Sequence, residues 1–172
     1  MIHRLLEADT RYSAQLRLAA PDGLLRRAAI VFAHSGDSWF VGAGLLGVWW
    51  LGSAAWKVIA IEFIVGIAVT AVVVLTVKLL VRRRRPAGEW GAIYRKADPH
   101  SFPSGHAARM AMLVVLGAGL GPLWFAGALL LWTPLVALAR VAMGVHYLSD
   151  VLVGALLGIG VGLAMLPFLM AR

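Results

Sequence analysis

Long apolar segments separated by short polar ones make up most of this 172-residue chain. Five of them reach or approach the length at which a helix crosses a lipid bilayer. We predict these spans at residues 28–51, 56–81, 104–121, 123–139 and 147–169. The second holds a β-branched run that would favour a strand in water, but in lipid every backbone polar group must be bonded within its own segment. The sequence therefore predicts an all-α integral membrane helical bundle of about five transmembrane helices.

The N-terminal segment has a different pattern. Over residues 3–19, leucines recur at helical spacing among charged residues, which predicts a short amphipathic helix on the membrane surface. A solvated helix without membrane contact is the alternative. We therefore divide the chain into an N-terminal interfacial segment, residues 1–24, and a transmembrane bundle, residues 25–172.

Composition agrees with a membrane protein. The chain is 61% hydrophobic, with a mean hydropathy of +0.85. Lys and Arg outnumber Asp and Glu by 16 to 8, an excess that would suggest nucleic acid in a soluble protein. Here the basic residues flank apolar runs, so the expected partner is the anionic lipid bilayer and not nucleic acid. The absence of cysteine excludes disulfides and thiolate chemistry.

Three polar clusters interrupt the apolar part of the chain: residues 78–86 (KLLVRRRRP), 103–106 (PSGH) and 140–150 (RVAMGVHYLSD). Polar groups in such segments need a reason, because burying them in lipid is costly. The clusters lie where the second span ends, the third begins, the fourth ends and the fifth begins. Successive spans cross in alternate directions, so all four ends should meet at one membrane face.

The first cluster places Lys78, Arg82 and Arg85 at spacings i, i+4 and i+7, which predicts one shared helical face that stops at Pro86. Three cations on one face repel each other unless an anion lies between them. Taken alone, the arginine run is more typical of a stop-transfer anchor at the headgroups.

The other clusters add a helix start and a His–Asp pair. Ser104 is placed to cap the third span, and Gly105 lets an anion approach the backbone there. His146 and Asp150 are four residues apart, so the carboxylate can hold Nδ1–H of the imidazole and leave the other nitrogen free. Arg140 can present a planar fork to phosphate oxygens.

Together these residues fit a phosphoryl group. They supply cations for its oxygens and two histidines, His106 and His146, of which one can act as a nucleophile and the other as an acid for the leaving oxygen. Neither a Cys/His metal cage nor a paired-carboxylate site fits the same residues. We expect no metal ion and no cofactor.

Two other features have structural interpretations. Residues 34–37 (HSGD) interrupt the start of the first span, and we interpret them as structural polar residues at the interface or facing the bundle. Gly154, Gly158 and Gly162 lie at four-residue spacing, which predicts a close-packing helix face. We expect that face to pack inside the chain rather than between copies, and the oligomeric state remains open.

The three clusters, in this order, resemble the motifs of the type 2 phosphatidic acid phosphatase (PAP2) superfamily. The matching residues are Lys78-x6-Arg85-Pro86, Pro103-Ser104-Gly105-His106 and Arg140-x5-His146-x3-Asp150. The likeness covers about residues 30–168. One departure is Ala139, where the third motif commonly has serine; the lost hydroxyl donor should weaken phosphate binding modestly.

The resemblance implies a role for each matching residue. His146 would attack phosphorus and form a phosphohistidine, with Asp150 orienting it, and His106 would protonate the leaving oxygen and then activate water. The residues that would bind the phosphoryl oxygens are Lys78, Arg85, Arg140, Ser104 and Gly105. Arg82 and Arg109 are extra cations nearby, either headgroup contacts or plain surface charge.

The implied activity is that of a metal-independent phosphatase acting on a membrane lipid phosphate or diphosphate. Polyprenyl phosphates and diphosphates, phosphatidic acid and phosphatidylglycerophosphate all fit, and the residues do not separate them. The alternative is a non-catalytic membrane transporter or assembly partner that binds a lipid phosphate. Binding alone needs only the cations, so His106, His146 and Asp150 together favour the enzyme. Vanadate haloperoxidase chemistry, also found in the family, is disfavoured by the hydrophobicity.

Charge bias predicts the side of the membrane. All Lys and Arg except Lys57 and Arg172 fall at the active-site end of the predicted spans, and the bias persists without the cations that the chemistry explains. The positive-inside rule then places the site at the cytoplasmic face of the cell membrane. Whether residues 87–102 close over the site stays open.

Overall fold

The structure, a computed structural model, describes residues 2–18, 23–87 and 98–171. These residues form seven helices and no strand, which confirms the all-α prediction. The helices are α1 (Ile2–Gln15), α2 (Leu24–Ser35), α3 (Ser38–Leu51), α4 (Ala54–Val81), α6 (Gly105–Leu120), α7 (Leu123–Ala142) and α8 (Leu148–Met170).

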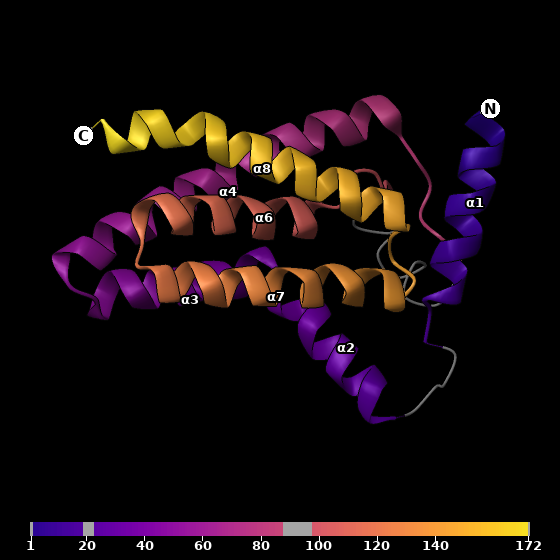
Figure 1. Ribbon diagram of the computed structural model, residues 1–172, viewed down its shortest axis with the longest axis horizontal. Helices are drawn as coiled ribbons and strands as arrows, with labels where there is room; N and C mark the ends of the chain where they lie inside the picture. Colours follow the sequence, from indigo (N-terminus) through magenta and orange to yellow (C-terminus); the bar gives the residue numbers. More distant parts are fainter. Residues whose placement is uncertain (1, 19–22, 88–97, 172) are drawn as a thin grey trace.

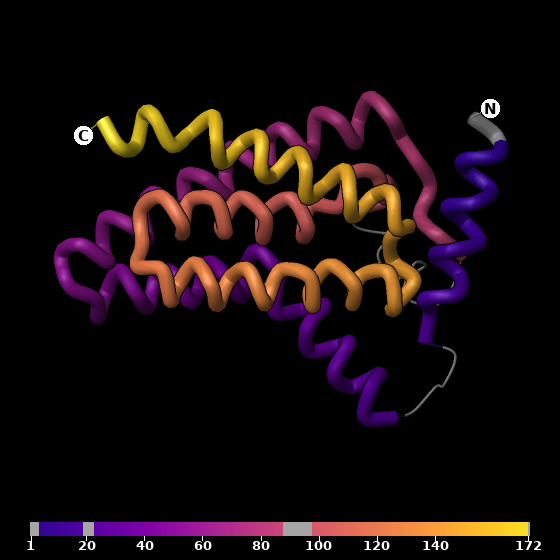
Figure 2. The backbone as a smooth tube through the Cα atoms, in the orientation of Figure 1, coloured from indigo at the N-terminus to yellow at the C-terminus, as the bar shows by residue number. Residues whose placement is uncertain are grey.

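The longer helices run along one axis. Figure 1 shows α4, α6, α7 and α8 following the long axis of the molecule, α2 leaving it obliquely, and α1 crossing one end. The tube in Figure 2 shows α6 and α7 as an antiparallel hairpin and the C-terminus at the end opposite α1. Helix α6 packs against α8, α7 and α4, so it is the central helix of the bundle.

The hydrophobic core forms around α6. Its Met112, Leu113 and Leu116 are buried against Phe63 of α4 and Val136 of α7. Helix α6 has 16 residues, about 24 Å at 1.5 Å per residue, so it is shorter than the hydrocarbon core of a bilayer. Because other helices surround it, α6 can carry polar residues in its first turns within the bundle.

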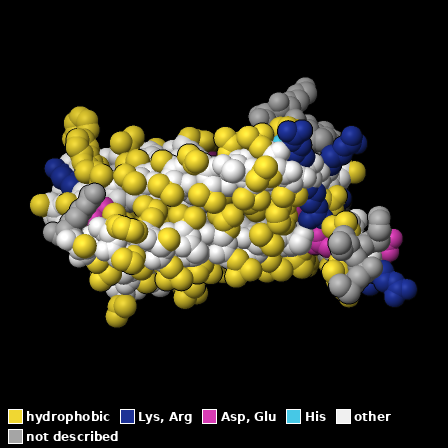
Figure 3. All heavy atoms as spheres, turned by 90° about the horizontal axis from the view of Figure 1, so that it is seen from above, with side chains coloured by type: hydrophobic (Ala, Val, Ile, Leu, Met, Phe, Trp, Pro, Cys, Tyr) yellow, Lys and Arg dark blue, Asp and Glu magenta, His cyan; other side chains and the backbone are white. Residues whose placement is uncertain are grey.

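Three helices, α4, α7 and α8, are long and apolar enough to cross a membrane by length and composition. Helices α3 and α6 are shorter apolar helices, so three of the five predicted spans meet that criterion. Large apolar side chains such as Val72, Leu131 and Leu156 are exposed, as expected of a surface that contacts lipid. Figure 3 shows apolar side chains along the flanks, with most visible Lys and Arg at one end. The chain is a membrane protein.

The first predicted span is wrong in one respect, because residues 28–51 do not form a continuous helix. Helix α2 stops at Ser35 and α3 starts at Ser38. A Cβ on Gly36 would lie 2.7 Å from Cγ1 of Val136, so the backbone packs directly on α7. Asp37 has extended backbone angles and precedes α3 as its N-cap residue. At the break, Asp37 contacts His106 of α6, and the carbonyl of Gly36 accepts from Arg109 of α6.

The glycine face of α8 packs inside the chain, as expected. A Cβ on Gly158 would lie 1.9 Å from the carbonyl oxygen of Ala108, and one on Gly154 would lie 2.5 Å from that of Ser104. Only glycine lets the two backbones approach this closely. The contact also fixes the starts of α6 and α8 next to each other.

Candidate active site

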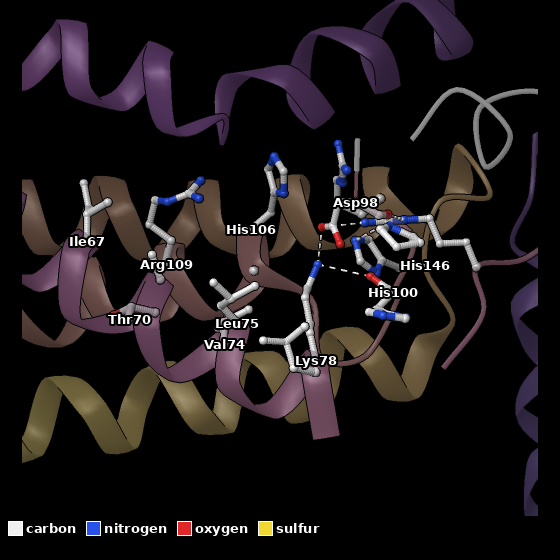
Figure 4. Close-up of a pocket in the computed structure, with 16 residues that line it drawn as sticks. Ile67, Thr70, Val74, Leu75, Lys78, Asp98, His100, His106, Arg109 and His146 are labelled. Carbon is white, nitrogen blue, oxygen red and sulfur yellow. Dashed lines mark hydrogen bonds and ion pairs between the residues drawn. The ribbon is translucent and has the colours of Figure 1, made fainter. Parts of the chain in front are cut away.

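A cavity of about 560 Å³ lies between the C-terminal half of α4, the start of α6 and the turn from α7 to α8. Lys78, Arg85, His106, Arg140 and His146 line it, so the structure brings side chains from all three clusters to one place. Figure 4 shows Lys78 and Asp98 pointing toward one another, with His146 beside them. The rest of the wall is largely apolar and belongs to α4, including Ile67, Val74, Leu75 and Leu79.

Helix α4 ends earlier than the arginine spacing predicted. Its last residue is Val81, and Arg82 adopts a left-handed conformation with φ 51°. The prediction that Lys78, Arg82 and Arg85 share a helical face is therefore wrong, because the helix ends before Arg82 and Arg85 lies outside it. The backbone N–H of Ser101 donates to the Arg83 carbonyl at 2.8 Å, which ties the segment after α4 to the segment before α6.

The two arginines after the helix end have different surroundings. Arg82 is exposed, and its Nε donates to the carbonyl of Leu79 at 2.8 Å, so it does not line the cavity. Arg85 is buried and does line it. Of the two additional cations named from sequence, Arg109 lies on the cavity wall and Arg82 does not.

Asp98, which sequence reasoning missed, lies between two of the cations. Its Oδ2 accepts hydrogen bonds from Nζ of Lys78 and, at 2.9 Å, from Nη2 of Arg85. Burial works to raise the pKa of this carboxyl, but the hydrogen bond to Lys78 and the charges of Lys78 and Arg85 outweigh burial and hold the pKa below its usual value. An ionised carboxylate here makes contacts that a phosphoryl oxygen could make. Residues 88–97, most of the segment considered for closure, lie outside the described residues.

The turn between α7 and α8 places Arg140 beside His146. The carbonyl of Arg140 accepts from the backbone N–H groups of Val145, at 3.2 Å, and His146, at 3.3 Å. Gly144 takes a left-handed conformation, φ 67°, within this turn. The side chains of Arg140 and His146 are both almost fully buried, so the guanidinium and the imidazole lie deep in the site rather than at its rim.

The contacts of the His146 ring favour one tautomer. Nη1 of Arg85 lies 3.2 Å from its Nε2, and since a guanidinium can only donate, Nε2 carries the lone pair. The proton is then on Nδ1, which lies 3.6 Å from Oδ2 of Asp150. That distance is within ion-pair range but longer than a hydrogen bond. The two groups are neighbours, but the expected hydrogen bond from Nδ1 of His146 to Asp150 is not formed.

The surroundings of His146 keep it neutral. Burial lowers the pKa of the imidazole well below its usual value, and the charges of Arg140, Arg85 and Lys78 lower it further. A neutral imidazole whose free nitrogen faces a cationic cavity can act as a nucleophile toward an anion.

The start of α6 has the expected cap. Oγ of Ser104 accepts from the backbone N–H of Ala107 at 3.5 Å. The N–H of Ser104 donates to the carbonyl of Asp150 at 2.8 Å, which ties the starts of α6 and α8 together. Gly105 lines the cavity, so the N-terminus of α6, with its favourable dipole, borders the space between the cations.

His106 has a carboxylate partner that sequence reasoning also missed. Its Nε2 lies 2.6 Å from Oδ1 of Asp37, in the α2–α3 break. Arg109, one turn further along α6, donates to the carbonyl of Gly36. The residues interpreted as structural therefore contact the second histidine of the site. The available signal was a polar tetrapeptide inside an apolar span.

A third missed group surrounds Asp150. Nη1 of Arg83 donates to Oδ1 of Asp150 and Nη2 donates to Oδ2 of Asp9, each at 2.7 Å. Asp9 also accepts from the backbone N–H of Ser149 at 3.0 Å, at the start of α8. Helix α1 is thus anchored to the start of α8, and the hydrophobic spacing of residues 3–19 did not predict this contact.

The arrangement can bind an anion and attack it. Lys78, Arg85 and Arg140 surround one cavity, with a neutral imidazole facing them. Within the described residues, no group of three or more His, Cys, Asp or Glu side chains is placed to hold a metal ion.

Comparison with known proteins agrees with this geometry. The sequence profile of the PAP2 superfamily matches residues 59–172. Two curated relatives, both decaprenylphosphoryl-5-phosphoribose phosphatases from strains of Mycobacterium tuberculosis, are 39% identical over 102 residues, which cover 56% of this chain and 54% of theirs. The chain therefore spans about half the length of these curated relatives.

Two solved structures are similar over most of the chain. Aquifex aeolicus LpxE has a TM-score of 0.73 and 25% identity, with coverage of 91% of this chain and 93% of that one. The transmembrane PAP2-type phosphatidylglycerolphosphate phosphatase from Bacillus subtilis has a TM-score of 0.72 and 22% identity, with coverage of 96% and 86%. The second likeness is one of fold.

Proposed function

This chain belongs to the PAP2 superfamily, and we propose from that premise that it is a metal-independent phosphatase that removes phosphate from a membrane lipid phosphate or diphosphate through a phosphohistidine intermediate. One observation carries the proposal. Nε2 of His146 lies 3.2 Å from Nη1 of Arg85, in a cavity that His146 lines together with Lys78, Arg85 and Arg140.

Binding of the phosphoryl group comes first. Its oxygens replace Asp98 on Lys78 and Arg85, and Arg140 adds a third cation. Arg85 then exchanges its bond to Nε2 of His146 for one to a phosphoryl oxygen, which frees the lone pair for attack. The Gly105 end of α6 contributes the positive end of the helix dipole.

In the first chemical step, the lone pair on Nε2 of His146 forms a bond to phosphorus. The bond from phosphorus to the leaving oxygen breaks, and that oxygen takes a proton from the His106 imidazolium. Asp150, 3.6 Å from Nδ1, stabilises the positive charge that develops on the His146 ring.

In the second step, water attacks the phosphohistidine. Neutral His106 takes a proton from the water, the new oxygen–phosphorus bond forms, and the phosphorus–nitrogen bond returns its electron pair to His146. Inorganic phosphate leaves, and both histidines return to their starting states. The cations stabilise the charge on the phosphoryl oxygens in both steps.

The cavity supports a lipid as the substrate. Lys78, Asp98 and His146 lie together at its polar end, and apolar side chains of α4 continue from them along the wall, with Arg109 among them near Ile67 (Figure 4). A phosphate at the polar end would leave an attached acyl or prenyl chain along Ile67, Val74 and Leu75. The curated relatives act on decaprenylphosphoryl-5-phosphoribose, so this lipid belongs in the substrate panel.

We place the site at the cytoplasmic face of the cell membrane. The charge bias supports this orientation, because basic residues gather at the end that holds the cavity (Figure 3). An alkaline-phosphatase fusion after Arg172 tests it. Activity of that fusion is expected, since the C-terminus would then lie outside, and an inactive fusion contradicts the orientation.

The decisive assay measures phosphate release in detergent with EDTA. The panel holds decaprenylphosphoryl-5-phosphoribose, a polyprenyl diphosphate, phosphatidic acid and phosphatidylglycerophosphate. Wild-type protein should release phosphate from at least one, and His146→Ala should release none. Equal release from both proteins removes the phosphohistidine mechanism. No release from any lipid favours a non-catalytic lipid-phosphate-binding protein.

A further inference from the structure

The break between α2 and α3 carries a carboxylate to the second histidine of the site. Oδ1 of Asp37 lies 2.6 Å from Nε2 of His106, while Oδ2 lies 2.9 Å from Nδ1 of His34. Both oxygens of Asp37 are therefore engaged by imidazoles. Asp37 lies outside the segment that matches the family profile, residues 59–172, and outside the three polar clusters.

The position of Asp37 is held by packing from several directions. A Cβ on Gly36 would lie 2.7 Å from Cγ1 of Val136, so the backbone sits directly against α7. The carbonyl of Gly36 accepts from Arg109, and Oγ of Ser35 accepts from Nε1 of Trp132 at 2.9 Å. The break is thus fixed to both α6 and α7, and this packing holds Asp37 in place against His106.

The same packing sets the orientation of the His106 ring. Cδ2 of His106 lies 3.3 Å from the place of a Gly36 Cβ, and Nε2 bonds Asp37. The ring edge that carries these two atoms faces the break. Nδ1 is on the opposite edge, and His106 lines the cavity, so Nδ1 is the nitrogen available for the proton transfer.

The charges around His106 explain why a carboxylate is needed. Arg140 of α7 and Arg109 of α6 line the same cavity as His106, and their charges oppose a positive charge on the imidazole. A general acid must carry that charge before it donates its proton. The Asp37 carboxylate, bonded to Nε2 of His106, offsets the two arginines, with His34 on its other oxygen.

We propose that Asp37 is a positioning residue for His106, which holds the Nε2–H tautomer and favours the protonated form that delivers a proton from Nδ1 to the leaving oxygen. The proposal rests on the proposed phosphatase reaction. It assigns a function to the polar interruption of the first apolar segment, where the helix break would otherwise have no chemical role.

The test compares Asp37→Asn with Ser35→Ala, which alters the same break without removing a charge near His106. With an alkyl phosphate ester, Asp37→Asn should lower kcat by roughly tenfold or more with little change in KM, and should move the alkaline limb of the kcat profile to lower pH. With an aryl phosphate whose leaving group is acidic, the loss should shrink, because that oxygen needs no proton donor. Ser35→Ala should show neither effect.

Three outcomes decide the matter. Unchanged kcat and pH profile in Asp37→Asn, with an active wild type, overturns the role of Asp37 and leaves the phosphatase proposal intact. A loss that is equal for both leaving groups, and is shared by Ser35→Ala, shows a structural effect only and also overturns it. An inactive wild type overturns the reaction itself.

Histidine ¹⁵N NMR of the protein in detergent gives a readout that does not require turnover. The His106 signal, identified by its loss in His106→Gln, should report the Nε2–H tautomer in the wild type. The opposite tautomer contradicts the proposal even where the enzyme is active.

Discussion

Nη1 of Arg83 donates to Oδ1 of Asp150 at 2.7 Å. The same guanidinium lies over the ring of Tyr147, with Cζ 3.9 Å from the ring centroid. The other oxygen of Asp150 accepts from the backbone N–H of Tyr147 at 2.8 Å. Asp150 orients His146 in our proposal. Arg83, two residues after the end of α4, therefore positions that carboxylate.

We expect Arg83→Gln to lower kcat at least tenfold, which corresponds to about 1.4 kcal/mol of lost transition-state stabilisation. Without its cation, Asp150 is free to turn away from His146, while the phosphate-binding residues stay in place, so KM should change little. Arg82→Gln is the matched control, because Arg82 is exposed and points away from the cavity. Steady-state kinetics of both variants check this, and equal losses contradict it.

The pH profile should reflect the neutral state of His146. Burial, followed by the charges of Arg140, Arg85 and Lys78, lowers the pKa of this imidazole below its usual value of 6.5. A nucleophile with a lowered pKa stays unprotonated until the pH falls through that lowered value. The acidic limb of kcat/KM should therefore lie below pH 6.5, in a titration from pH 4 to 9 at fixed ionic strength. An acidic limb at or above 6.5 is inconsistent with His146 as the nucleophile.

Asp98→Asn should strengthen binding of phosphate. In the wild type a phosphoryl oxygen must displace the carboxylate that bonds Lys78 and Arg85, and a neutral amide competes less for these cations. We expect the inhibition constant of inorganic phosphate to fall by roughly three- to tenfold, up to about 1.4 kcal/mol.

The control is His100→Ala, which keeps the backbone carbonyl that accepts from Lys78 at 3.1 Å. Weaker inhibition of Asp98→Asn by phosphate would mean that Asp98 organises the cations rather than occupying their ligand position.

Gly158→Ala should destabilise the bundle. The added Cβ would lie 1.9 Å from the Ala108 carbonyl oxygen, so α6 and α8 must separate, at a cost of about 1–3 kcal/mol or more. Gly160→Ala on the same helix is the control, because nothing lies within 4 Å of its added Cβ. Thermal unfolding in detergent should show a lower Tm than wild type for Gly158→Ala and an unchanged Tm for Gly160→Ala. Similar Tm values would contradict the packing of this face.

Much of the fold followed from hydrophobic length alone. Residues 56–81 and 147–169 were predicted as helices because nothing else satisfies the backbone in lipid, and α4 and α8 match them within a few residues. Alternating crossings then predicted that Lys78, His106 and His146 meet, and all three line one cavity. The argument needed no side-chain detail.

Periodicity failed where the chain leaves its helices. Helical spacing predicted Arg82 and Arg85 on the same face as Lys78. The helix ends at Val81, however, with Arg82 in a left-handed conformation, and of these two arginines Arg85 lines the cavity. Periodicity also treated residues 28–51 as one span, although Gly36 and Asp37 break it against α6 and α7. Helical periodicity describes one segment at a time, so it does not predict which helices pack against each other.

The sequence by itself determined that this is a helical membrane protein whose polar clusters hold a set of cations and the histidines His106 and His146, which our proposal assigns to a phosphoryl group. Both the apolar segments that bury in lipid and the order of the motifs can be read from the linear sequence. Only the tertiary structure decided which carboxylates serve those groups: Asp37 on His106, Asp98 on Lys78, and Asp9 through Arg83 on Asp150. The physical reason is that the partner of a buried charge comes from whichever element packs beside it. A single charged residue of this kind produces no periodic pattern in its own segment from which the partner could be predicted.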